Sequence, residues 1–340
     1  MAILKGAGAI TAAFLLIMLV SYWAAGRAKP ALDAAIRSAL QKQGLAHAFI
    51  ELPDGVVHYR LEGPADGPLV VFVHGLSTPS FVFDDYVTPL TEAGYRVLTF
   101  DNYGRGLSDR PGLVYDADLT DRLIVNLLDT LGLAAPAHFV GYSMGGAASV
   151  IFAARHPERV RSLTLIAPAG LGVSPALKES ILARPLIGDW IARMFGLRIF
   201  HGLAAEEARK APDPVRFLAD FDRQMNYRGY DDAIVSTIRH YPLDGSEAAF
   251  ADAGRSPRPV LVIWGEADET VPFVHAKKLM SLMPRAKLYS YPRLGHDIGY
   301  SQAPMLRELI LGFLSGQDNE AGATSMRIGT RPAKAAPEAR

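Results

Sequence analysis

The sequence predicts an α/β fold in which helices flank one mainly parallel central sheet, and three observations support this prediction. First, runs such as Leu69–Val73 and Pro259–Trp264 are apolar throughout, as expected for strands that helices cover on both faces. Second, helical stretches separate most of these runs, and this alternation is typical of a parallel sheet. Third, chemically distinctive residues follow several runs, where ligands bind in open α/β sheets.

Length and composition exclude several classes of function. The chain has 340 residues, of which 49% are hydrophobic and 21% charged, enough for one large core or two modest ones. Basic and acidic residues number 35 each, so no charge excess indicates a nucleic-acid partner or the capture of highly charged substrates. The chain contains no cysteine, which excludes disulfides, thiolate catalysis and zinc bound by cysteine.

Residues 1–29 are predicted to form an N-terminal membrane anchor, which would make this a single-pass membrane protein. The stretch Gly6–Gly26 has no charged residue, and as a helix rising ~1.5 Å per residue it can cross a hydrocarbon core ~30 Å thick. A cleaved secretory signal and a buried soluble helix are the alternatives, although the residues that follow make a poor cleavage site. Lys5 precedes the stretch and Arg27 and Lys29 follow it, so the side of the membrane stays open.

The remaining chain divides by its patterns. Residues 30–46 are expected to form a spacer helix, and residues 47–170 the first part of the core. Residues 171–255 show helical stretches and no convincing strand, and an insertion of this length predicts a helical lid rather than a loop. Residues 256–315 resume the alternation and complete the core, whereas residues 316–340 lack apolar periodicity and are expected to be disordered.

A candidate nucleophile lies in the run Gly141-Tyr142-Ser143-Met144-Gly145. This G-x-S-x-G pattern is informative where a strand enters it and a helix leaves it, because the serine must occupy a strained turn above the sheet. The apolar pair Phe139-Val140 precedes the turn, and small residues that favour a close-packed helix follow it. Taken alone, the pattern also fits a glycine-rich corner between a strand and a helix.

Two further candidates follow later strands. Asp268 comes after the strand that ends at Trp264, and His296 comes after the next one. A serine, a carboxylate and a histidine, each after a strand, follow the chain order of a Ser-Asp-His triad. Glu266 is the alternative acid, and Asp297 is expected to have a local role.

These motifs resemble those of the lid-bearing α/β-hydrolases, and within them the carboxylesterases and monoacylglycerol lipases with an N-terminal anchor. The resemblance covers roughly residues 50–314. It implies an α/β-hydrolase fold with a helical lid inserted between core strands, here preceded by a transmembrane helix. The motifs are His74-Gly75, Asp101–Ser108, Gly141–Gly145, Trp264–Asp268 with Val271-Pro272, and Gly295-His296.

The resemblance implies a role for each candidate. Ser143 would be the nucleophile, His296 the base and then the acid, and Asp268 the group that holds the imidazole tautomer. The backbone N–H groups of Leu76 and Met144 would form the oxyanion hole. We expect no cofactor and no metal, since no histidine pair has the spacing of a motif such as H-E-x-x-H.

The predicted function is a serine hydrolase that cleaves partly hydrophobic carboxylic esters through an acyl-enzyme on Ser143. Its expected partners are a small-molecule ester or lipid and the membrane. The alternative is a carbon–carbon bond hydrolase of ring-fission dienoates, a group that shares the Ser-Met-Gly-Gly elbow but usually carries a glycine-rich run after His-Gly; here Leu76-Ser77-Thr78-Pro79 follows. A cofactor-free haloperoxidase-like enzyme or a hydroxynitrile lyase on the same triad, and a catalytically silent binding protein, also stay open.

Overall fold

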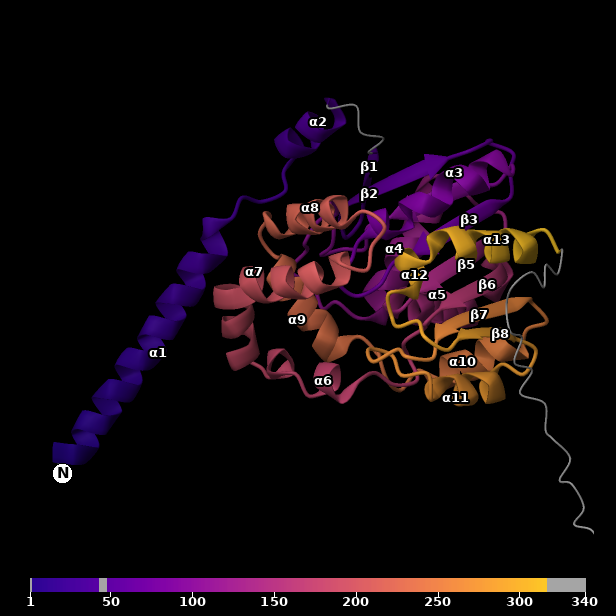
Figure 1. Ribbon diagram of the computed structural model, residues 1–340. Coiled ribbons are helices and arrows are strands. Elements are labelled where there is room, and N and C mark those ends of the chain that lie inside the picture. Colours follow the sequence, from indigo (N-terminus) through magenta and orange to yellow (C-terminus); the bar gives the residue numbers. More distant parts are fainter. Residues whose placement is uncertain (1, 43–47, 317–340) are drawn as a thin grey trace, which may run out of the picture.

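The computed structural model describes residues 2–42 and 48–316 (Figure 1). Its centre is an eight-stranded sheet with the strand order β1-β2-β4-β3-β5-β6-β7-β8. β2 pairs antiparallel with β1 and β4, and the remaining neighbours pair in parallel, so the predicted mainly parallel sheet is confirmed. The predicted disordered tail lies outside the described residues beyond residue 316.

The strands coincide closely with the apolar runs in the sequence. β3, β5 and β7 are buried along their whole length, which explains why these runs lack the alternation of half-exposed strands. The strands are β1 (Ala48–Leu52), β2 (Gly55–Glu62), β3 (Leu69–Val73), β4 (Arg96–Phe100), β5 (Ala137–Tyr142), β6 (Val160–Ile166), β7 (Val260–Gly265) and β8 (Lys287–Tyr291).

Helices cover both faces of the sheet. One layer contains α3 (Asp84–Glu92) and α13 (Ala303–Leu314), which pack against each other. The other contains a connected group formed by α4 (Ala117–Thr130), α5 (Met144–Arg155), α10 (Glu247–Arg255) and α11 (His275–Leu282). The short helices η1 (Ser80–Phe83), η2 (Pro157–Arg159) and α12 (Ile298–Ser301) lie in connections after β3, α5 and β8.

The helical insert predicted between core strands is present after β6. It comprises α6 (Pro175–Lys178), η3 (Ile181–Ala183), α7 (Ile187–Ala208), α8 (Pro214–Met225) and α9 (Tyr230–His240). These helices have a small core of their own, in which the rings of Phe200 and Tyr230 meet edge to face at 5.6 Å. α10 instead packs against α5, so the helices α6 to α9 form the part that we call the lid.

The N-terminal segment forms α1 (Ala2–Ala28) and α2 (Ala34–Lys42). The end of α1 lies against α7, where the Trp190 indole N–H donates to Ser21 Oγ at 3.1 Å and the Arg193 guanidinium lies 3.9 Å from the centre of the Tyr22 ring. Among the helices that the structure describes, none combines the length and apolar character that crossing a bilayer requires. The prediction of a transmembrane helix in residues 1–29 is therefore not supported.

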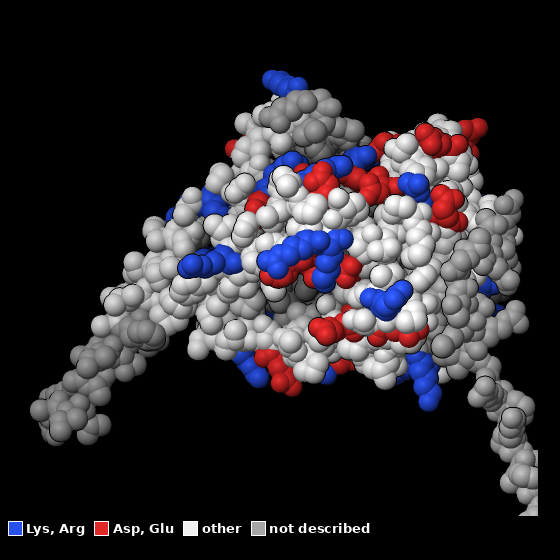
Figure 2. Space-filling view, viewed as in Figure 1, with Lys and Arg blue, Asp and Glu red and all other residues white. Residues whose placement is uncertain are grey.

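The surface seen in Figure 2 carries charges of both signs. Lys and Arg side chains are interspersed with Asp and Glu over the described part of this face. The face is hollowed near its centre, and side chains of both signs border the hollow. This pattern agrees with the equal numbers of basic and acidic residues, and it offers no single-sign field to steer a charged polymer.

Candidate active site

Ser143 occupies a strained turn between β5 and α5. Its backbone has φ 56° and ψ −120°, a region that residues other than glycine rarely adopt. Backbone hydrogen bonds hold this conformation: the Ser143 N–H donates to the carbonyl of Ile166 at 2.9 Å, and the Ser143 carbonyl accepts from the N–H groups of Gly146 at 2.9 Å and Ala169 at 3.0 Å. Such strain persists where the surrounding structure over-determines it, and it is common at functional sites.

The glycine that follows Ser143 by two residues allows α5 to approach β3. A Cβ atom on Gly145 would lie 1.9 Å from the carbonyl oxygen of Val73 and 2.7 Å from that of His74. No side chain fits at those distances. The G-x-S-x-G pattern thus reflects close contact of backbones around the serine.

The side chains of Ser143, His296 and Asp268 form one chain of hydrogen bonds. His296 Nε2 lies 2.9 Å from Ser143 Oγ, and His296 Nδ1 lies 2.7 Å from Asp268 Oδ2. The other carboxylate oxygen accepts from the N–H groups of Thr270 at 2.9 Å and Val271 at 2.8 Å, which fixes its orientation. Because a carboxylate faces Nδ1, that nitrogen carries the proton, and Nε2 can accept the proton of the serine hydroxyl.

The alternative acid and the adjacent carboxylate bind elsewhere. Glu266 accepts a hydrogen bond from Ser290 Oγ at 2.6 Å. Asp297 lies 3.4 Å from the Lys210 ammonium of the lid. Of these carboxylates, Asp268 is the one hydrogen-bonded to the His296 ring.

Tyr142 positions His296 through a stacking contact and a hydrogen bond, and the sequence offered no signal for this role. Its ring stacks on that of His296 with centroids 5.2 Å apart, and its hydroxyl donates to the His296 carbonyl at 2.7 Å. Burial raises the pKa of Tyr142 well above its usual value, so the hydroxyl stays protonated and remains a donor.

The two expected oxyanion donors belong to segments that adjoin Ser143. Met144 is the first residue of α5, where the helix leaves its N–H groups without intrahelical partners and places its positive end. The chain before Leu76 passes beside the serine, since a Cβ atom on Gly75 would lie 3.7 Å from Ser143 Oγ. The Leu76 N–H makes no hydrogen bond to another described residue.

His74 orders the loop that carries Leu76. Its Nε2 accepts from the Asn102 N–H at 2.9 Å, so Nδ1 carries the proton and donates to the Gly75 carbonyl at 2.8 Å. Burial lowers the pKa of His74 to about 4, which keeps the ring neutral. His74 therefore has a structural role in its own loop.

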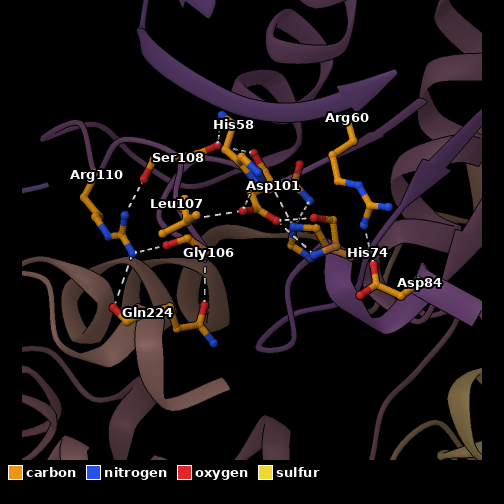
Figure 3. A network of polar contacts seen from close by, with 12 residues as sticks. His58, Arg60, His74, Asp84, Asp101, Gly106, Leu107, Ser108, Arg110 and Gln224 are labelled. Carbon is orange, nitrogen blue, oxygen red and sulfur yellow. Dashed lines mark hydrogen bonds and ion pairs between the residues drawn. The ribbon is translucent and has the colours of Figure 1, made fainter. Parts of the chain in front are cut away.

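Asp101 connects the same loop to β2 and to the turn after β4 (Figure 3). One oxygen accepts from the Ser80 N–H at 2.9 Å and the Ser80 hydroxyl at 2.6 Å. The other contacts His58 Nδ1 at 2.7 Å and accepts from the Leu107 N–H at 2.9 Å. Burial opposes ionisation, but the contacts with His58 and Ser80 together outweigh it and hold the pKa of Asp101 well below its usual range.

A metal centre is not apparent in the described part of the chain. Within residues 2–42 and 48–316, no group of three or more His, Asp or Glu side chains is placed to hold a metal ion.

Residues 68–302 match the family model of the alpha/beta hydrolase fold. The chain belongs to the α/β-hydrolase family. It is 28% identical over 302 residues to a 2-hydroxy-6-oxononadienedioate/2-hydroxy-6-oxononatrienedioate hydrolase of Comamonas testosteroni, covering 81% of this chain and 94% of that one. It is 27% identical over 302 residues to a 2-hydroxy-6-oxo-6-phenylhexa-2,4-dienoate hydrolase of Burkholderia cepacia, with the same coverage of 81% and 94%.

The crystal structure of an enol-lactonase from Burkholderia xenovorans LB400 resembles this α/β-hydrolase in fold. The TM-score is 0.66 at 23% identity, over 79% of this chain and all of that one. At this identity the likeness shows the shared fold. Family membership makes the protein a hydrolase.

Proposed function

We propose that this α/β-hydrolase cleaves a carbon–carbon bond beside a ketone in a ring-fission dienoate, with Ser143 as nucleophile. The observation that carries the mechanism is the hydrogen-bonded chain from Asp268 through His296 to Ser143 Oγ. The substrate class rests on the two relatives named as dienoate hydrolases, which align with 81% of this chain. The proposal reverses the preference drawn from the sequence, in which esters came first.

In the first step Ser143 Oγ attacks the ketone carbon, C6, of a substrate in its 2-oxo form. His296 Nε2 takes the hydroxyl proton, and Asp268 stabilises the resulting imidazolium. The ketone oxygen becomes an oxyanion, to which the N–H groups of Leu76 and Met144 donate.

In the second step the C5–C6 bond breaks. Its electron pair passes through the conjugated chain to the 2-oxo oxygen, which takes the proton from His296, and the acyl group stays on Ser143. Water then attacks the acyl carbon while His296 takes its proton, and Ser143 Oγ leaves and recovers that proton. The products are a carboxylic acid and a shorter 2-hydroxydienoate.

Hydrolysis of carboxylic esters is the second candidate. It uses the same groups, with an alkoxide in place of the carbon leaving group. Leu76-Ser77-Thr78-Pro79 after His74-Gly75 favours it, because the carbon–carbon bond hydrolases usually carry a glycine-rich run there.

A paired assay separates the candidates. The purified protein would be given 2-hydroxy-6-oxo-6-phenylhexa-2,4-dienoate and, separately, p-nitrophenyl esters of graded chain length, with Ser143→Ala as control. We expect kcat/KM to be higher for the dienoate by at least about 100-fold, equivalent to ~2.7 kcal/mol of transition-state stabilisation. A preference of that size for an ester would overturn the proposal in favour of an esterase.

Membrane association of residues 1–29 stays a prediction. Among the described side chains of α1, five large apolar ones are 56% to 65% exposed: Leu16, Ile17, Leu19, Val20 and Trp23. Sedimentation with liposomes by the full chain, but not by a chain that begins at Lys29, is the expected result. Full chain that stays in the supernatant would show that this segment has no membrane role.

A further inference from the structure

The loop after β3 is held by the lid as well as by the core. Gln224 of α8 is 1% exposed, and its amide N–H donates to the Ser77 carbonyl at 3.0 Å. The oxygen of the same amide accepts from the Gly106 N–H at 2.9 Å, a contact visible in Figure 3. One lid side chain thus joins the loop that carries Leu76 to the turn after β4.

A second connection runs through Arg105, which is also 1% exposed. Its Nε donates to the Leu76 carbonyl at 2.8 Å, and its Nη2 donates to the hydroxyl of Thr237 in α9 at 2.7 Å. No carboxylate among the described residues forms an ion pair with Arg105. Burial lowers its pKa to about 10, so the group is still a cation at neutral pH and makes charge-assisted hydrogen bonds.

The two connections meet on consecutive carbonyl groups, those of Leu76 and Ser77. The Leu76 N–H, one peptide unit earlier, is the proposed oxyanion donor. We propose that Gln224 is a positioning residue through which the lid, together with Thr237 and Arg105, fixes the Leu76 N–H relative to Ser143. The inference rests on the proposed function, since it presupposes an oxyanion formed at Ser143.

The expected effect falls on kcat. An oxyanion donor acts in the transition state and not on the bound substrate, so its displacement leaves KM nearly unchanged. Removal of one such donor lowers kcat by about 10²–10³-fold, and a displaced donor should lose part of that.

The test compares Gln224→Met with wild type. Methionine has similar length but makes neither amide hydrogen bond. We expect kcat to fall by about 10–100-fold, with KM within about 3-fold and with a parallel loss of affinity for a boronic acid that forms a tetrahedral adduct on Ser143. The matched control is Asp222→Asn on the same helix, where the carboxylate contacts His201 on the surface, and it should change neither constant.

In the Gln224→Glu variant, lowering the pH should restore the lost kcat. A protonated Glu can accept from the Gly106 N–H and donate to the Ser77 carbonyl, as the glutamine does, whereas the carboxylate can only accept. The ratio of variant to wild-type kcat should therefore rise as pH falls. The charged and titratable groups around this position come from α8 itself and from the neighbouring elements. Those that line the same cavity are His58, Arg60, Asp84, Asp85, Asp101, Arg216, Asp220 and Arg223, and Arg110 and Tyr230 contact the Gln224 and Ser77 carbonyls.

Thr237→Val and Thr237→Ser test the second connection if the Gln224 variants do not fold. Only the serine keeps the hydroxyl that accepts from Arg105, so it should keep kcat while the valine variant loses it. A folded Gln224→Met variant with wild-type kcat and boronate affinity would overturn the inference alone. A wild type that neither hydrolyses substrates nor reacts at Ser143 would overturn the proposed function and this inference together.

Discussion

Replacing Gly145 by alanine should damage both stability and catalysis, because it forces apart the two backbones on which the serine turn depends. The added Cβ would lie 1.9 Å from the Val73 carbonyl oxygen and 2.5 Å from its carbon. Carbon and oxygen atoms in close contact normally stay about 3.3 Å apart, so β3 and α5 must separate by more than about 1 Å.

The two effects have separate magnitudes. Overpacking of this kind costs about 1–3 kcal/mol of unfolding free energy. A displacement of about 1 Å at a reacting group costs about 10²-fold in rate. We therefore expect Gly145→Ala to lower kcat by about 100-fold or more, well beyond what a stability loss alone would cause in a protein that is still folded.

Urea unfolding and steady-state kinetics measure both effects. Gly202→Ala in α7 is the matched control, because an added Cβ there meets no atom within 4 Å. In a helix interior that change should be neutral or stabilising by up to about 1 kcal/mol. If Gly145→Ala kept wild-type stability and kcat, the argument from close backbone contact would be refuted.

Two other substitutions have defined outcomes. Asp101→Asn should lower the unfolding free energy by about 3–5 kcal/mol in urea titrations, because it leaves buried donors facing an amide nitrogen. Because folding lowers the pKa of Asp101, ionisation of its carboxyl stabilises the folded protein at pH values above the unfolded-state pKa of about 4. This stabilisation is lost as the pH falls from that value toward the folded-state pKa. The Asp101→Asn variant should therefore lose less unfolding free energy in acid than the wild type does. Asp268→Asn should lower kcat by up to about 10⁴-fold through the wrong His296 tautomer. Near-normal kcat in that variant, with a large loss in Glu266→Gln, would reassign the acid.

Much of the fold could be predicted from the sequence because its signals are local. Strands buried on both faces leave continuous apolar runs, and the run Leu69–Val73 has the same ends as β3, whereas Pro259–Trp264 is displaced by one residue from β7. The lid helices were harder to delimit. Glycine disfavours a helix interior, yet α7 continues through Gly196 to Ala208, and the missing side chain of Gly196 lets Asp231 of α9 approach.

The candidate site likewise contains residues that local motifs predict and residues that they do not. Motif order along the chain singled out Ser143, Asp268 and His296, and the structure places both Ser143 and Asp268 within hydrogen-bond distance of the His296 ring. Tyr142 and Gln224 escaped notice because their partners lie 154 and 147 residues away in sequence. No local pattern encodes such contacts, which form only when the lid and the loop after β8 that carries His296 pack against the rest of the folded chain.

The most direct test of the account is covalent labelling of the nucleophile. A fluorophosphonate reacts with a serine whose hydroxyl proton is taken by a base and whose tetrahedral product is stabilised by nearby N–H groups. After incubation of the full chain, intact-mass and peptide mass spectrometry should show one adduct, located on Ser143, and none in Ser143→Ala. An adduct that persists in Ser143→Ala, or an active wild type that is not labelled at Ser143, would contradict the assignment of this serine as the nucleophile.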